Sequence, residues 1–209
     1  TTFSDPVIWF DDGFYYIAHT LKQFVETNKF AILRSDNSLS QWDAYYTFDC
    51  SSASNALGDI VRTCWSPRIF KDTDGSNYLT ISLSTNLASA ANMRLFVTRA
   101  TDNTFTNWTP LVMLTNSLDV PNYAGCLYKS NNQYQVWTKY NGAFMEIHVA
   151  TNIYGPWSAW KTGNWVAWAG PHEQAQPIRN SRGRWTVLLS NGGLFKQYFV
   201  VATNDNFSN

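Results

Sequence analysis

Residues 4–20, SDPVIWFDDGFYYIAHT, form the stretch that decides the fold. Two runs rich in β-branched and aromatic residues, 7–10 and 14–17, flank the sequence Asp11-Asp12-Gly13. Asp-Gly between such runs is typical of a tight β-hairpin, because Gly accepts the positive φ that the turn requires. The stretch therefore predicts a hairpin, and it carries a single acid at its start, Asp5, before Pro6.

The same pattern recurs along the chain. Hairpin-like stretches occupy residues 5–17, 66–81, 124–137 and 176–189. Each is followed by an apolar strand and a polar turn, at residues 29–42, 94–108, 146–160 and 197–209. The first three of these segments close on a tryptophan, at Trp42, Trp108 and Trp160. The period is roughly fifty to sixty residues, which is the size of one propeller blade.

All-strand repeats of this size predict an all-β fold, a β-propeller that forms a single domain over residues 1–209. A β-sandwich also contains many short strands, but it does not repeat one four-part pattern four times. The fourth unit stops before its closing tryptophan and outer strand. Because a propeller protects its strand edges by closing radially, either four blades close with one outer strand missing or a fifth blade follows Asn209. We favour the fifth blade.

The composition excludes several function classes. Lys plus Arg equals Asp plus Glu at 15 each, so no net charge attracts nucleic acid. No apolar run is long enough to cross a membrane. Aromatic residues reach 16%, with ten tryptophans. Strand cores account for most of these rings, and a sugar-binding surface accounts for others.

Three cysteines are too few for a disulfide scaffold. Cys50 and Cys64 bracket a short loop that a disulfide would close in an oxidising compartment, with Cys126 left as a buried thiol. No Cys/His spacing resembles a zinc site. We expect a secreted, monomeric protein whose partner is a carbohydrate.

Residues just before the innermost strand of each blade converge on one mouth of the central channel. These positions hold Asp5, Trp65 to Arg68, Asp119 to Tyr123, and His172 to Gln174. Two carboxylates that face each other across a channel are what glycoside hydrolysis needs, one as acid and one as base.

These motifs resemble glycoside hydrolase family 43, which comprises arabinanases, arabinofuranosidases and β-xylosidases. The resemblance rests on Asp5-Pro6 with its Asp-Gly-x-Tyr-Tyr turn, on Trp65-Ser66-Pro67 and on Gly155-Pro156-Trp157. It covers nearly the whole chain and implies four of the five blades of such enzymes. It also implies an inverting glycosidase that acts on arabinose- or xylose-containing plant cell-wall glycans.

The resemblance assigns the general base to Asp5 and the general acid to Glu173. Gln174 and Ala175 replace the Gly and Pro that usually follow that acid. A third acid, which orients the general acid and tunes its pKa, should open the third blade. Asp119 is the nearest acid, but Asn122 holds the better-aligned place. For inversion, the Asp5 and Glu173 carboxyls should lie roughly 6.5–9.5 Å apart.

The substrate-binding candidates lie around the same mouth. They are Trp65, Arg68, Tyr123, Trp168 and His172. The two tryptophans would stack on sugar rings, whereas Arg68 would contact a ligand or pair with Asp5. We expect no cofactor and no metal ligand among these residues; family relatives sometimes bind a channel cation through a histidine of the fifth blade.

Two rival functions compete with hydrolysis. A carbohydrate-binding propeller that has lost catalysis fits the irregular third blade. A sialidase fits less well, because the Asp-box turns of that fold require Gly at the positions that Leu39 and Phe105 occupy here.

Overall fold

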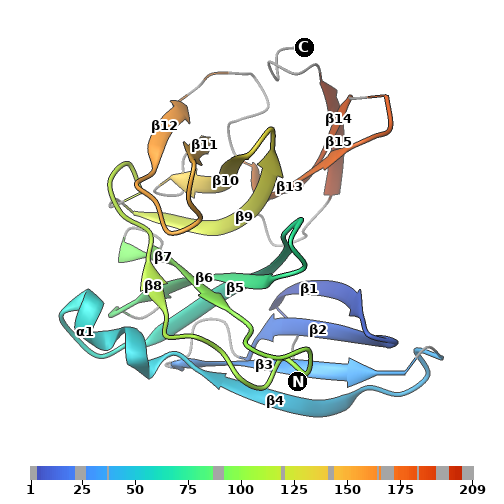
Figure 1. Ribbon diagram of the computed structural model, residues 1–209. Coiled ribbons are helices and arrows are strands. Elements are labelled where there is room, and N and C mark those ends of the chain that lie inside the picture. Colours follow the sequence, from blue (N-terminus) through green and yellow to red (C-terminus); the bar gives the residue numbers. More distant parts are fainter. Residues whose placement is uncertain are drawn as a thin grey trace.

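Figure 1 shows the computed structural model of the chain, in which four sheets follow one another in a fan. It describes residues 4–21, 27–36, 38–86, 92–118, 121–140, 144–163, 165, 172–182, 184–191 and 198–203. For residues 4, 172–174, 190–191 and 198–203 it describes the backbone alone.

Each sheet is one antiparallel blade, built in chain order. Blade 1 contains β1 (Ser4–Asp11), β2 (Phe14–Thr20), β3 (Lys29–Ser35) and β4 (Asp43–Asp49). A short 3-10 turn (Ser51–Ala53) and helix α1 (Ser54–Leu57) lead to the next sheet. Blade 2 contains β5 (Thr63–Lys71), β6 (Asn77–Ser84), β7 (Arg94–Arg99) and β8 (Val112–Met113).

Blades 3 and 4 repeat the same order. Blade 3 contains β9 (Asn122–Ser130), β10 (Gln133–Tyr140), β11 (Phe144–Ala150) and β12 (Ser158–Lys161). Blade 4 contains β13 (His172–Arg179), β14 (Trp185–Asn191) and β15 (Tyr198–Thr203). The predicted all-β propeller with about four blades is confirmed, and the fourth blade has three described strands, as its shorter sequence repeat indicated.

The hairpin predicted at residues 4–20 is present. Asp11 pairs with Phe14, and the two turn residues Asp12 and Gly13 both have positive φ, at 46° and 82°. Positive φ at both central residues is what a type I′ turn requires, and its twist matches that of the flanking strands.

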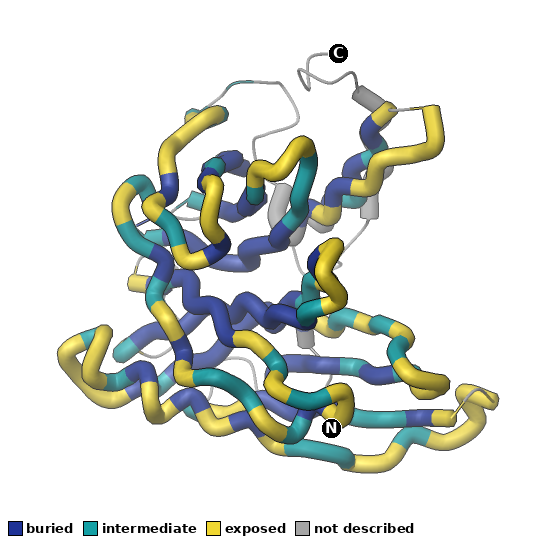
Figure 2. The backbone as a smooth tube through the Cα atoms, in the orientation of Figure 1, coloured by how far each residue is buried: buried dark blue, intermediate teal, exposed yellow. Residues whose placement is uncertain are grey.

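The hydrophobic core lies between neighbouring blades rather than inside any one sheet (Figure 2). Tyr16 and Phe30 of blade 1 pack with Leu79 and Ile81 of blade 2. The second cluster joins blades 2 and 3, and a third joins blades 3 and 4 around Trp185. Because each blade buries its faces against the next, the packing holds the inner strands in register around a shared axis.

The loops that follow the third strands share one conformation. In each, an Asp or Asn side chain accepts from a backbone N–H two residues later, and the next residue has positive φ. The accepting and positive-φ residues are Asp36 and Leu39, Asp102 and Phe105, and Asn152 and Gly155. The sequence repeat is therefore also a repeat of local backbone geometry.

This loop geometry corrects one pairing in the sequence repeat. Trp42 and Trp108 stand three residues after the positive-φ positions, and Trp157, not Trp160, stands two residues after Gly155. Trp157 is buried in the second core cluster. Trp160 instead lies in the outer strand β12 and is 40% exposed.

The three cysteines are buried thiols. The Cys50 and Cys64 sulfurs lie 3.2 Å apart, so the predicted pairing partners are neighbours in space. Burial raises the pKa of the Cys126 thiol to about 11, although the nearby Arg68 guanidinium opposes that shift. Among the described residues, no helix is long and apolar enough to cross a membrane.

Candidate active site

The inner strands of blades 1, 2 and 3 share an unusual feature at the channel mouth. In each, two residues oppose one residue of the second strand, which is a β-bulge. The first bulge residue has positive φ in every case, at 51° for Asp5, 52° for Ser66 and 55° for Ala124. Left-handed backbone at a residue other than Gly is costly and persists where the surroundings impose it. The mouth is therefore built from one repeated backbone device.

The register of blade 4 extends the pattern to β13. Glu173 pairs with Ser190 and Gln176 pairs with Leu188, so Gln174 and Ala175 are the two bulge residues. Gln174 is thus the register counterpart of Asp5. Glu173 corresponds to the residue one place earlier in the other blades, which is Ser4, Trp65 or Tyr123.

Hydroxyl groups of the preceding blade hold these bulges in place. The backbone N–H of Ser66 donates to Thr20 Oγ1 at 3.2 Å. The backbone N–H of Ala124 donates to Ser82 Oγ at 2.9 Å. Thr20 and Ser82 occupy the same register position in β2 and β6, so each blade fixes the mouth residue of its successor.

Asp5 is 5% exposed, and its main chain is held by blade 2. Arg68 Nη1 donates to the carbonyl oxygens of Asp5 and Pro67, both at 3.1 Å, and to that of Pro6 at 3.5 Å. Sequence alone left Arg68 as a ligand contact or as a partner of Asp5. In the structure its hydrogen bonds go to main-chain carbonyls, so Arg68 positions the backbone that carries the Asp5 carboxylate.

Trp65 and Tyr123 lie side by side in the wall of the mouth. Their ring centroids are 6.5 Å apart with the planes at 74°, and each residue is 8% exposed. Met93 and Ala124 complete this small cluster. The two rings are brought together as predicted, but packing covers most of their surface, which limits the area that either can offer to a sugar.

Several predicted site residues fall outside what the structure describes. Asp119 and Trp168 lie outside the described residues, and of His172 and Glu173 only the backbone is described. The separation of the Asp5 and Glu173 carboxyl groups is therefore still a prediction. Both residues do belong to inner strands, β1 and β13, at the bulged ends of those strands.

The structure identifies the third-blade counterpart of Asp5 as Ala124. Asn122, which the sequence favoured for the third acid, pairs with Tyr140 two residues before that bulge. The bulge position of blade 3 thus carries a methyl group, buried against Trp65 and Tyr123. The repeat stretches 5–17, 66–81 and 124–137 already align Ala124 with Asp5 and Ser66, whereas the place expected for the third acid lay two residues earlier, at Asn122.

Lys139 is a mouth residue that sequence reasoning missed. It pairs with Tyr123 and so stands in β10 where Thr20 and Ser82 stand in β2 and β6. Those two residues bond the bulge of the next blade, and β10 contacts β13. Lys139 is 2% exposed. The shared register predicts that this buried cation faces the bulge of β13, and the available signal was that Lys139 is the single charged residue of β10.

Comparisons with known proteins concern the fold. No protein-family model and no curated protein matches the chain. Solved structures do match it over nearly its whole length. The fold is that of family-43 glycoside hydrolases. The predicted resemblance is confirmed at this level.

Three of the similar structures illustrate the match. An endo-arabinase from Bacteroides thetaiotaomicron is 14% identical, with 96% of this chain and 75% of that chain covered and a TM-score of 0.69. An α-L-arabinofuranosidase from Lactobacillus brevis is 14% identical, with 98% and 68% covered and a TM-score of 0.66. A GH43 β-xylosidase/α-arabinofuranosidase from a compost microbial metagenome is 14% identical, with 97% and 71% covered and a TM-score of 0.67. At this identity the likeness establishes the fold, and the activity is a separate question.

The described residues contain no cluster of three His, Cys, Asp or Glu side chains that could hold a metal ion.

Proposed function

We propose that the chain is a glycoside hydrolase of the inverting kind, acting at the channel mouth on arabinose- or xylose-containing glycans. The observation that carries this proposal is Asp5, a buried carboxylate on left-handed backbone that Arg68 holds from blade 2. Strain at a buried charged residue is typical of functional sites. The structural neighbours with names that mention arabinan or xylan chemistry support the substrate class.

In this proposal Asp5 is the general base and Glu173 is the general acid. Asp5 takes a proton from a water molecule, and that water attacks the anomeric carbon of the bound sugar. Glu173 donates a proton to the leaving glycosidic oxygen, which balances the proton that Asp5 has accepted. Secretion belongs to the same proposal, since its substrate is a cell-wall polysaccharide, and we propose a monomer as its active form.

The test is reducing-sugar release from arabinan and arabinoxylan by the full chain. Asp5→Asn and Glu173→Gln should each lower the rate about 100-fold or more, because general acid–base catalysis contributes about 10²–10⁴-fold. The products should first appear with inverted anomeric configuration in an NMR time course. Activity that neither substitution changes would contradict the assignment of both residues.

A second candidate function is a carbohydrate-binding propeller without turnover, and blades 3 and 4 favour it. Ala124 leaves the bulge position of blade 3 without an acid, and the shared register predicts that the buried Lys139 faces β13. A neighbouring cation lowers the pKa of a carboxyl group, which opposes the role of general acid at neutral pH.

One experiment distinguishes the two functions. Lys139→Met would remove the cation and, in a hydrolase, should move the basic limb of the pH–rate profile upward, because the pKa of Glu173 rises. In a binding propeller, wild type and Lys139→Met both lack turnover while the wild type still binds the glycan in a titration.

A further inference from the structure

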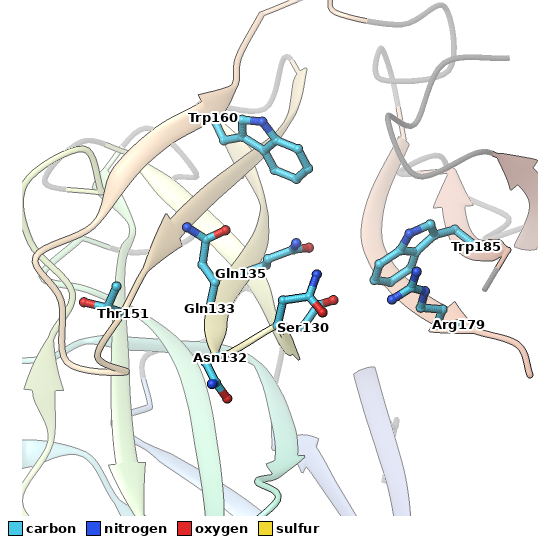
Figure 3. Close-up of a pocket in the computed structure, with 9 residues that line it drawn as sticks. Ser130, Asn132, Gln133, Gln135, Thr151, Trp160, Arg179 and Trp185 are labelled. Carbon is cyan, nitrogen blue, oxygen red and sulfur yellow. The ribbon is translucent and has the colours of Figure 1, made fainter.

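A cavity opens between blades 3 and 4 on the face opposite the mouth. It has a volume of about 550 Å³ and is lined by the β9–β10 turn, the end of β13 and the start of β14 (Figure 3). The bulge residue Ala124 lies near the start of β9, and Ser130 ends the strand, so about 20 Å of strand separates the mouth from this cavity. Ligand sites in proteins typically measure about 300–1,000 Å³. The cavity is therefore large enough to be a site in its own right.

The interface between blades 3 and 4 differs from the first two blade interfaces in its charged residues. Between blades 1 and 2, Lys71 bonds Asp11, the last paired residue of β1. Between blades 2 and 3, Lys129 bonds Asp72, the residue just after β5, at 2.7 Å. Each pair joins two neighbouring inner strands at the ends that lie away from the mouth.

Blade 3 has no acid at the corresponding places. Ser130 is the last paired residue of β9, and Asn131 follows it. Blade 4 still presents a cation, Arg179, at the end of β13. The ion pair that joins the other interfaces is thus replaced by neutral groups, and the cavity occupies this part of the interface.

The lining of the cavity is polar but nearly uncharged. Six of its nine lining residues are Ser, Thr, Asn or Gln, two are Trp, and Arg179 carries the single formal charge. Gln135 is 6% exposed, and its Oε1 accepts from Trp137 Nε1 at 3.2 Å. That bond fixes the buried amide and presents its NH₂ group as a donor. The lining offers few charged groups to bind a cation or a multiply charged anion, whereas it offers many hydrogen-bond partners to a ligand rich in hydroxyl groups.

Two aromatic rings border the same space. Trp160 lies on β12 at one side, and Trp185 lies with Arg179 on blade 4 at the other (Figure 3). The Arg179 guanidinium carbon is 5.7 Å from the Trp185 ring centroid. Trp160 is 40% exposed, whereas Trp157 is the tryptophan of this blade that is buried in the core. An exposed ring beside fixed amides gives both an apolar face and hydrogen bonds that orient a ligand.

We propose that this cavity is a second carbohydrate-binding site, which takes a short neutral oligosaccharide segment. Trp160 covers the apolar face of a sugar ring, and Gln133, Gln135 and Arg179 bond its hydroxyl groups. The site holds the polysaccharide on the face opposite the mouth, so it is independent of the proposed chemistry at Asp5.

The test is a calorimetric titration of the full chain with xylohexaose and with arabinohexaose. Asp5→Asn serves as the parent, so that turnover does not consume the probe. Trp160→Ala in this parent should remove one binding site per chain, or weaken it about tenfold, which corresponds to about 1.4 kcal/mol. Gln133→Ala, a change at an exposed lining residue, should weaken the same site to a smaller extent.

Phe10→Ala is the matched control. Phe10 is an exposed aromatic residue near the end of β1, in the corresponding region of blade 1 and away from the cavity, so its loss should leave binding unchanged. Unaltered binding in both Trp160→Ala and Gln133→Ala would overturn the proposal. A wild-type protein without turnover, but with binding that depends on Trp160, would overturn only the proposed hydrolysis at the mouth.

Discussion

Blades 1 and 3 begin with inner strands that follow the same path, β1 and β9, and the two strands differ in charge at both ends. At the mouth, the left-handed bulge residue is Asp5 in blade 1 and Ala124 in blade 3. At the opposite end, Asp11 of blade 1 bonds Lys71, whereas blade 3 ends in Ser130 and borders a cavity. The repeat thus determines the backbone conformation, whereas the side chains at equivalent positions differ in charge from blade to blade.

The largest stability effect should come from the buried ion pair between blades 2 and 3, Lys129 with Asp72. Burial opposes ionisation of Asp72, but hydrogen bonds from Lys129, Tyr134 and Thr73 outweigh it and hold the pKa of Asp72 below its ordinary value. Asp72→Asn should lower the free energy of unfolding by about 2 kcal/mol at pH 7, because hydrogen bonds to a charged group are lost. Urea unfolding would measure the loss.

The pH dependence of that loss follows from the direction of the shift. A lowered pKa in the folded state stabilises the protein above the ordinary Asp pKa of about 4, and the contribution disappears as the pH falls through the folded-state value. The difference between wild type and Asp72→Asn should therefore shrink below about pH 4. Lys71→Met, which removes a lysine that is 53% exposed and leaves Asp11 its hydrogen bond from Asn77, is the control and should cost well under 1 kcal/mol. Equal losses in the two variants would contradict the contrast between the interfaces.

A smaller effect should come from the second bulge residue, which is Pro6 in blade 1 and Gly125 in blade 3. A Cβ atom on Gly125 would lie 2.9 Å from both δ carbons of Leu95, a buried residue of blade 2. Gly125→Ala should destabilise the protein by about 1–2 kcal/mol, since overpacking a core forces neighbouring side chains to move. Thermal unfolding would check this, and a variant as stable as wild type would show that the blade contact is looser than its geometry indicates.

The smallest effect should come from giving blade 3 the acid that it lacks. Asn131 has a positive φ of 50°, which Asp also tolerates, so Asn131→Asp should preserve the turn. The new carboxylate would face the same cavity as Arg179 and should raise stability by less than 1 kcal/mol, an effect that salt removes. The variant should also bind oligosaccharide more weakly at the cavity. Stronger binding would contradict the neutral character that we infer for this site.

Much of the fold was predictable from the sequence, because turn residues and strand periodicity are local. The Asp-Gly hairpin, the four repeats and the three described strands of the fourth blade all follow from such patterns. The bulges were not predictable from the sequence, because Asp5, Ser66 and Ala124 share no residue type. Contacts with the preceding blade hold two of the three bulges. The repeat stretches did align Ala124 with Asp5 and Ser66, but the place expected for the third acid lay two residues earlier, at Asn122. The exchange of Trp160 for Trp157 arose because two tryptophans lie three residues apart and the chain gives no sign of which one packs.

The site could be predicted only in part. Asp5 was identified from a motif, and its burial and its support by Arg68 agree with a functional role. Lys139 and the cavity between blades 3 and 4 depend on which strands of different blades become neighbours. Such contacts join residues far apart in the chain, so no single stretch of sequence encodes them.

We propose that the same left-handed bulge carries chemistry at Asp5 in blade 1 and none at Ser66 in blade 2. The direct measurement is the kcat of Asp5→Asn and of Ser66→Ala on arabinan and arabinoxylan, each compared with wild type. These residues share the same bulge position and nearly the same φ, so a purely structural role would make the two variants similar. The account predicts a loss of about 100-fold or more for Asp5→Asn and a kcat within about twofold of wild type for Ser66→Ala. Equal losses in both variants, or full activity in Asp5→Asn, would contradict it.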